Sequence, residues 1–165
     1  MKEILLNLER CNGCLSCAMA CAVEHADGET ILGAMLEKVK PRINVEPFNG
    51  GAVPIICRHC EDPACVDACM AGAMQKDATS GFVNNEGGQQ ECVGCWMCVM
   101  ACPYGAVVQG LGPEKKALKC DHCSQRDVPA CVAACPNEAL VFEEPDQFSK
   151  ERRRKTVVAL TGTGI

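Results

Sequence analysis

Sixteen cysteines are the residues of this 165-residue chain whose type and spacing point most directly to chemistry. They form four groups of four, here called groups one to four, and no cysteine is left over. The groups are Cys11, Cys14, Cys17 and Cys21; Cys57, Cys60, Cys65 and Cys69; Cys92, Cys95, Cys98 and Cys102; and Cys120, Cys123, Cys131 and Cys135. Groups one and three have the spacing C-x2-C-x2-C-x3-C, and groups two and four keep its two ends but widen the middle gap.

This spacing is typical of ligation to a [4Fe–4S] cluster. Three thiolates in a short loop can surround one corner of a cubane, while the backbone N–H groups of the loop point at its sulfur atoms. In two-cluster ferredoxins the fourth cysteine ligates the other cluster. Pro103 and Pro136 follow groups three and four as in that motif, whereas Ala22 and Met70 follow groups one and two. The sequence therefore predicts four [4Fe–4S] clusters.

Zinc and disulfides are the other common uses of clustered cysteines. Structural zinc sites take two well-separated C-x2-C pairs, and the compact triple of groups one and three does not suit a single ion. Disulfides need an oxidising compartment. The N-terminal sequence MKEILLNLERC lacks the features of a secretory signal, and no run approaches the roughly 18 apolar residues of a membrane helix. We therefore expect a cytoplasmic metal-binding protein without direct membrane insertion.

The order of the groups indicates a repeat in which one two-cluster unit is inserted into another. Groups two and three would form the inserted unit, within residues 52–110; groups one and four would form the split unit, from residues 1–51 and 111–148; residues 149–165 would be a basic C-terminal tail. In this arrangement each fourth cysteine crosses to its sister cluster. The predicted ligand sets, here called sites I to IV, are in order Cys11, Cys14, Cys17 and Cys135; Cys120, Cys123, Cys131 and Cys21; Cys57, Cys60, Cys65 and Cys102; and Cys92, Cys95, Cys98 and Cys69. A contiguous pairing, of group one with two and three with four, is an alternative that the spacing does not exclude.

The segments around the cysteines predict an α+β fold of two ferredoxin-like units with little regular secondary structure. We expect strands at residues 2–8, 43–45, 81–83, 106–108 and 140–142. We expect helices at residues 15–25, 66–68 and 132–134, while residues 26–40 show no clear periodicity. Aromatic residues make up only 4% of the chain, so bound clusters would occupy the volume that large side chains usually fill.

Clusters with four thiolate ligands have no open coordination site, so we expect them to carry single electrons and not to transform a substrate. The chain has neither a G-x-G-x-x-G motif nor a P-loop. A net charge of −5 leaves no basic footprint for nucleic acid across the body of the chain. These features predict an electron-transfer subunit of an oxidoreductase complex or an electron carrier, with no catalytic site of its own.

Three histidines and a tryptophan also lie near the cysteines. His25, His59 and His122 could ligate iron, but sixteen cysteines already supply four clusters, so we expect the histidines beside the clusters. His59 and His122 occupy equivalent places in C-R-H-C and C-D-H-C. Trp96 is expected to shield its cluster from water.

Basic residues gather near the end of the chain, where a single acidic residue, Glu151, lies among Lys150, Arg152, Arg153, Arg154 and Lys155. One interpretation is a solvated charge run on a loose terminus. The other is a docking segment for an acidic partner.

At its motifs the sequence resembles the four-cluster electron-transfer subunits of the DMSO-reductase iron–sulfur subunit and formate-hydrogenlyase (HycB-like) superfamily. The runs CNGCLSCAMACAVEH, PIICRHCEDPACVDAC and CVGCWMCVMACPYGA are most similar to the CooF type, which is associated with CO dehydrogenase. The resemblance covers about residues 2–145 and implies the inserted arrangement and the crossing ligands. Met70 departs from the proline of many relatives, and the basic tail has no counterpart.

The resemblance favours a subunit that relays low-potential electrons from a CO dehydrogenase or a tungsten aldehyde:ferredoxin oxidoreductase to a second redox partner, a flavoprotein or a ferredoxin. Other hypotheses are a subunit of a formate dehydrogenase or hydrogenase, a free polyferredoxin carrier, and a wire that self-associates end to end.

Overall fold

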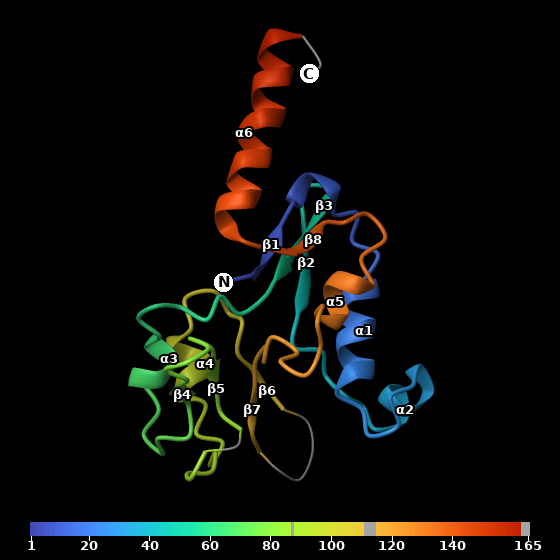
Figure 1. The fold of residues 1–165 in the computed structure, drawn as a ribbon. Helices are drawn as coiled ribbons and strands as arrows, with labels where there is room; N and C mark the ends of the chain where they lie inside the picture. Colours follow the sequence, from blue (N-terminus) through green and yellow to red (C-terminus); the bar gives the residue numbers. More distant parts are fainter. Residues whose placement is uncertain (87, 111–114, 163–165) are drawn as a thin grey trace.

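The computed structural model describes residues 1–86, 88–110 and 115–162, in which short helices and strands connect the cysteine loops (Figure 1). The strands are β1 (Glu3–Leu6), β2 (Asn44–Phe48), β3 (Gly51–Ile55), β4 (Gln75–Lys76), β5 (Val83–Asn84), β6 (Val108–Gln109), β7 (Ala117–Leu118) and β8 (Leu140–Glu143). The helices are the 3-10 turn η1 (Leu8–Arg10), α1 (Ser16–Glu24), α2 (Ile31–Leu36), α3 (Ala64–Asp67), α4 (Met97–Ala101), α5 (Ala130–Ala133) and α6 (Pro145–Thr161). The predicted α+β class with little regular secondary structure is confirmed.

The strands form four antiparallel pairs, β1 with β8, β2 with β3, β4 with β5 and β6 with β7. The first pair joins the two ends of the chain, with Leu6 opposite Leu140. Group one follows β1 and group four precedes β8, so this pairing brings the two cysteine loops together. Leu140 is only 2% exposed and anchors the pair in the core.

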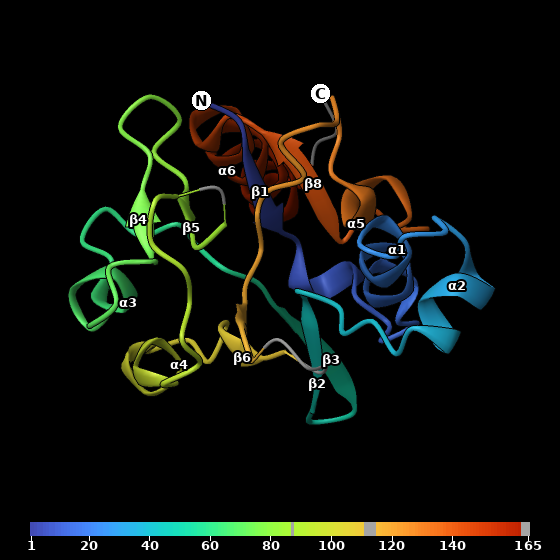
Figure 2. The same ribbon diagram turned by 90° about the horizontal axis from the view of Figure 1, so that it is seen from below.

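Cysteines make up much of two separate hydrophobic cores. One contains cysteines of groups one and four around Ile43, Ile56 and Leu140. The other contains cysteines of groups two and three around Met74 and Val83. In Figures 1 and 2, α1, α2 and α5 lie on one side of the molecule, and α3, α4, β4 and β5 lie on the other. This grouping favours the inserted arrangement, although its predicted boundary after residue 110 lies at the edge of the described residues.

Most predicted elements form, with shifted ends. The helix expected at residues 15–25 is α1, and the strand expected at 140–142 is β8. The strands expected at 81–83 and 106–108 begin later and are two residues long, as β5 and β6. Residues 26–40 contain α2, whose first turn is capped by Thr30, since its Oγ1 accepts a hydrogen bond from the Gly33 N–H at 3.0 Å.

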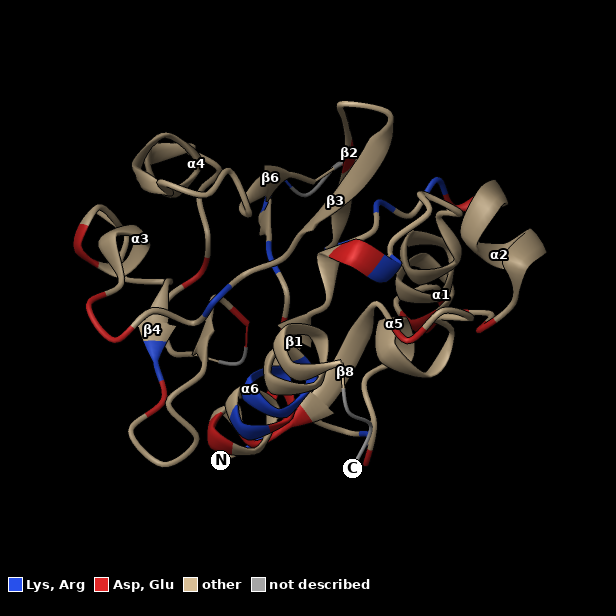
Figure 3. Ribbon diagram, turned by 90° about the horizontal axis from the view of Figure 1, so that it is seen from above, with Lys and Arg blue, Asp and Glu red and all other residues tan. Residues whose placement is uncertain are grey.

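The predicted basic tail forms most of a regular helix, α6, and not a loose terminus. Pro145 begins the helix and Gly162, in the left-handed conformation, ends it. Figure 1 shows α6 projecting from the β1–β8 pair, and Figure 3 shows Lys and Arg gathered on it. An ion pair of 3.3 Å between Arg152 Nη1 and Glu9 Oε1 ties its base to the body. Residues 163–165 of the predicted tail lie outside the described residues, and among the helices that are described, none is long and apolar enough to cross a membrane.

Candidate iron–sulfur sites

The loops of groups one and three share an unusual backbone conformation. Gly13 and Gly94 have φ angles of 71° and 67°, and two residues later Leu15 and Trp96 also have positive φ, at 62° and 63°. Residues in this left-handed region turn the chain sharply, so the first three cysteines of each group curl around one space. A Cβ on Gly94 would lie 2.8 Å from the Cβ of Lys115 and closer still to its carbonyl oxygen. Only glycine fits there.

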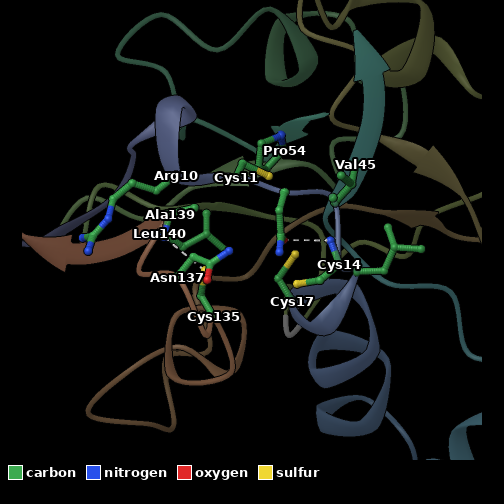
Figure 4. A pocket seen from close by; sticks show the side chains of 13 residues that line it. Arg10, Cys11, Cys14, Cys17, Val45, Pro54, Cys135, Asn137, Ala139 and Leu140 are labelled. Atoms are coloured by element: carbon green, nitrogen blue, oxygen red, sulfur yellow. Dashed lines mark hydrogen bonds between the residues drawn. The ribbon is translucent and has the colours of Figure 1, made fainter. Parts of the chain in front are cut away.

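The first three cysteines of group one share a cavity with a cysteine from the far end of the chain. Cys11 and Cys14 approach from the loop before α1, Cys17 from the first turn of α1, and Cys135 from the segment after α5 (Figure 4). The cavity has an empty volume of about 330 Å³, part of it open to solvent. All four cysteines of predicted site I therefore line one space.

An equivalent cavity lies on the other side of the molecule. Its lining includes Cys92, Cys95 and Cys98 together with Cys69, the four members of predicted site IV. Its empty volume is also about 330 Å³, and Trp96 lines it, as expected for a side chain that shields the site.

The structure also brings together members of sites II and III. Burial raises the pKa of the Cys120 thiol to about 12 and raises the pKa of Cys123 and Cys131, and the charge of the neighbouring Cys21 raises all three further. In the same way, burial raises the pKa of Cys65 to about 11, with further increases from Cys57 and Cys102. Cys60 lies in the same loop, three residues after Cys57.

Thiols with such high pKa values would stay protonated at neutral pH unless a metal displaced the proton. Backbone N–H groups also donate hydrogen bonds to several sulfur atoms, which stabilises thiolates. These bonds run from Arg42 to Cys21 (3.2 Å), His59 to Cys57 (3.5 Å), Met74 to Cys69 (3.3 Å), His122 to Cys120 (3.3 Å) and Ala139 to Cys135 (3.1 Å). The donor set fits iron–sulfur ligation, in which N–H bonds to sulfur adjust the potential.

The spacing of the cysteines fits a cluster better than a single ion. Across the described residues, no group of three His, Cys, Asp or Glu side chains is close enough to hold one metal ion. A cubane spreads its ligands over four iron atoms, so they need not converge on one point. The cysteine-lined cavities are therefore suited to clusters.

The three histidines lie beside the cysteines, and the rings of His25 and His59 hydrogen bond to groups other than the cysteine sulfurs. His25 Nδ1 lies 2.7 Å from the carbonyl oxygen of Cys21, and its Nε2 lies 3.0 Å from Asp121 Oδ2. Burial alone would lower the pKa of His25, but these two contacts raise it to about 10, so the ring is charged. His59 and His122 are buried, and burial lowers the pKa of both.

Sequence reasoning missed three charged residues around the sites. Asp121 binds both His25 and Arg42, each at 3.0 Å, and its Oδ1 accepts a hydrogen bond from the Cys123 N–H at 3.1 Å. Lys119 is buried directly before Cys120. Charged residues next to a ligand cysteine were the available signal for Asp121 and Lys119, while Arg42 lies far from any cysteine in the sequence.

Comparison with known proteins agrees with this geometry. A family model described as a 4Fe-4S dicluster domain matches residues 49–145, and one described as a 4Fe-4S binding domain matches residues 8–24. The electron transport protein HydN of Escherichia coli K12 is 36% identical over 173 residues, covering 94% of this chain and 97% of HydN. An iron-sulfur protein of Rhodospirillum rubrum is 36% identical over 163 residues, covering 88% of this chain and 83% of that protein.

Two further matches are more distant. The putative electron transport protein YsaA of Escherichia coli K12 is 32% identical over 157 residues, covering 94% of this chain and 98% of YsaA. A chain of the benzoyl-coenzyme A reductase active site complex BamBC is 21% identical to this chain. The two structures have a TM-score of 0.46, and the match covers 99% of this chain and 93% of that chain. From the family model and the relatives, the chain belongs to the 4Fe-4S dicluster domain family and is an iron–sulfur protein with an electron-transfer role.

Proposed function

We propose that the chain binds four [4Fe–4S] clusters and relays low-potential electrons between a catalytic oxidoreductase and a second redox protein. Bound clusters supply reversible one-electron transfer. Each would be held by one of sites I to IV, with three cysteines from one loop and one from its sister loop. The observation that carries this proposal is the cavity in which Cys135 joins Cys11, Cys14 and Cys17 from the opposite end of the chain.

The contacts between the sites favour a single file in the order I, II, III, IV. Cys17 of site I and Cys131 of site II belong to one core, across the contact between α1 and α5, and the charge of Cys17 raises the pKa of Cys131. Sites II and III are both close enough to Lys119 for its charge to act on them. Sites III and IV share the second core, where α3 packs against α4.

Both ends of this file reach the surface. Cys14 of site I and Cys95 of site IV are exposed, whereas the other cysteines are partly or fully buried. Exposed apolar side chains adjoin each of them, Leu15 beside Cys14 and Val93 beside Cys95. We propose that one end faces the electron donor and the other end faces the acceptor.

The partner we favour is a CO dehydrogenase or a tungsten aldehyde:ferredoxin oxidoreductase, with a flavoprotein or a ferredoxin as the second partner, because the cysteine motifs resemble the CooF type. The projecting α6, with its basic residues, offers a docking element for an acidic surface on one of these partners.

Two measurements test this function. The anaerobically reconstituted chain should contain about sixteen iron atoms and take up about four electrons in a reductive titration, one for each cluster; half these values would overturn the four-cluster proposal. A tagged chain purified anaerobically from its native cells should bring a nickel–iron or tungsten enzyme with it in stoichiometric amount. A lone monomer that exchanges electrons equally well with any ferredoxin-dependent enzyme would contradict a dedicated partner.

A further inference from the structure

Lys119 is a buried lysine that lies between the two cysteine-rich cores. Its side chain is only 2% exposed, and it lies between β7 and Cys120. Its Nζ donates one hydrogen bond to the carbonyl oxygen of Cys120 at 2.8 Å and another to the carbonyl oxygen of Val83 in β5. One ammonium group therefore connects the loop of group four to the β4–β5 hairpin beside groups two and three.

A buried ammonium is costly unless an opposite charge lies nearby. Both hydrogen-bond acceptors of Lys119 are neutral carbonyl groups. Among the described residues no carboxylate forms an ion pair with it, and the neighbouring Asp121 is already bound by Arg42 and His25. The two acceptors of Lys119 place it between the inner sites, because Cys120 is a ligand of site II and Val83 belongs to the core against which Cys65 of site III packs.

Aromatic rings pack against one another near this lysine, beside Val83 and Cys120. The Phe82 ring stacks on His122 with centroids 4.2 Å apart, and the His59 and His122 rings meet edge to face at 5.4 Å. The Val83 N–H donates to His59 Nδ1 at 2.9 Å, and burial with the Lys119 charge lowers the pKa of His59 to about 3. Because Lys119 is itself only 2% exposed, little water is present to screen its charge.

We propose that Lys119 is the shared counter-charge of the two inner sites, II and III, and that it holds the reduction potentials of both above the values they would have without it. The inference rests on the proposed function. Reduction adds one negative charge to a site, so a fixed cation between two sites favours the reduced form of each. Sites I and IV, at the ends of the file, lack such a buried cation among the contacts of the described residues.

The test is a redox titration of the anaerobically reconstituted full chain, followed by electron paramagnetic resonance. In Lys119→Met, two of the four midpoint potentials should fall together, by at least the 59 mV that corresponds to a tenfold change in a one-electron equilibrium. The other two should stay in place, and Lys119→Arg should leave all four unchanged. Unchanged potentials in Lys119→Met, or an equal shift of all four, would overturn the proposal.

Lys76 offers a matched control. Its Nζ also donates to carbonyl oxygens in the loop of group two, those of Cys60 at 3.1 Å and Glu61 at 2.8 Å, but the residue is exposed. Water screens an exposed charge, so Lys76→Met should move the potential of site III less than Lys119→Met does. An equal or larger shift would show that burial of the cation is not what matters, and would contradict the proposal.

Loss of iron in Lys119→Met would still be informative. If Lys119→Gln loses iron as well and Lys119→Arg keeps it, the positive charge is what the inner sites require, as proposed. If Lys119→Arg loses iron too, Lys119 acts through its shape and the proposal fails. Fewer than four clusters in the unmodified chain would instead refute the proposed function itself, independently of Lys119.

Discussion

Gly94→Ala tests whether the loop of group three can close around its site only with glycine at this position. Gly94 has nearly the same backbone conformation as two glycines that serve as controls, with φ of 67° at Gly94, 71° at Gly13 and 69° at Gly81. They differ in the space that a side chain would meet. A Cβ would lie 2.8 Å from Lys115 Cβ at Gly94 and 3.0 Å from Ala52 Cβ at Gly13, and would meet nothing within 4 Å at Gly81.

These contacts set the expected magnitudes. Alanine in the left-handed region costs about 1–2 kcal/mol at each of the three positions. Gly94→Ala adds a collision with the Lys115 backbone, and overpacking of this kind costs a further 1–3 kcal/mol, roughly. The loop that carries Cys92 and Cys95 is the part that must move. We therefore expect Gly94→Ala to lose the cluster of site IV, leaving about twelve of about sixteen iron atoms.

The assay is iron and sulfide per chain, together with the guanidinium midpoint measured anaerobically from the cluster absorbance. Gly81→Ala should keep all its iron and show only the conformational cost, and Gly13→Ala should fall between the other two. The reasoning is refuted if Gly94→Ala keeps its full iron content and is no less stable than Gly81→Ala.

Three further predictions concern the helix α6, an ion pair and the core. Deletion of residues 150–165 should leave the iron content unchanged but weaken electron transfer with the partner, measured as a higher KM in a coupled assay; an unchanged KM would rule out docking through α6. Asp121→Ala removes the carboxylate that pairs with His25 and Arg42, and should lower the free energy of unfolding by about 1–3 kcal/mol. The control Glu138→Ala, in the exposed pair with Arg10, should lower it by about 0–1 kcal/mol. Equal losses in guanidinium titrations would count against the Asp121 network. Leu140→Ala, at a residue 2% exposed, should lower the free energy of unfolding by about 2–5 kcal/mol. Leu160→Ala, at a residue 82% exposed, should lower it by less than about 0.5 kcal/mol. Similar losses in the two variants would contradict the burial of Leu140 in the core.

The cysteine groups could be predicted from the sequence because ligation depends on short spacings within a loop. The strands β1 and β8 were also predictable from their apolar runs, although their pairing needs the whole fold. The two-residue strands β5 and β6 were misplaced by a residue or two, since so short an element is decided by its neighbours and not by propensity.

Other features depend on tertiary contacts that leave no local pattern. Lys119 looks like any surface lysine in the sequence, and only the folded chain shows that it is buried and bound to the carbonyl oxygens of Val83 and Cys120. Helix α6 is not among the helices that the sequence predicts, because its basic run indicated either a loose terminus or a docking segment. The crossing ligand sets were predicted from the inserted arrangement; the structure brings their members together, and ligation itself stays a proposal.

The central claim is that cysteines distant in the sequence share one cluster, and counting iron in double variants tests it most directly. Cys21 and Cys131 both belong to site II in the inserted arrangement, so Cys21→Ala with Cys131→Ala should remove one cluster and leave about twelve iron atoms. Cys21→Ala with Cys65→Ala removes ligands from two sites and should leave about eight. The contiguous pairing of group one with group two makes the opposite prediction, because Cys21 and Cys65 would then share a cluster. About eight iron atoms in the first variant and about twelve in the second would therefore contradict the proposed arrangement.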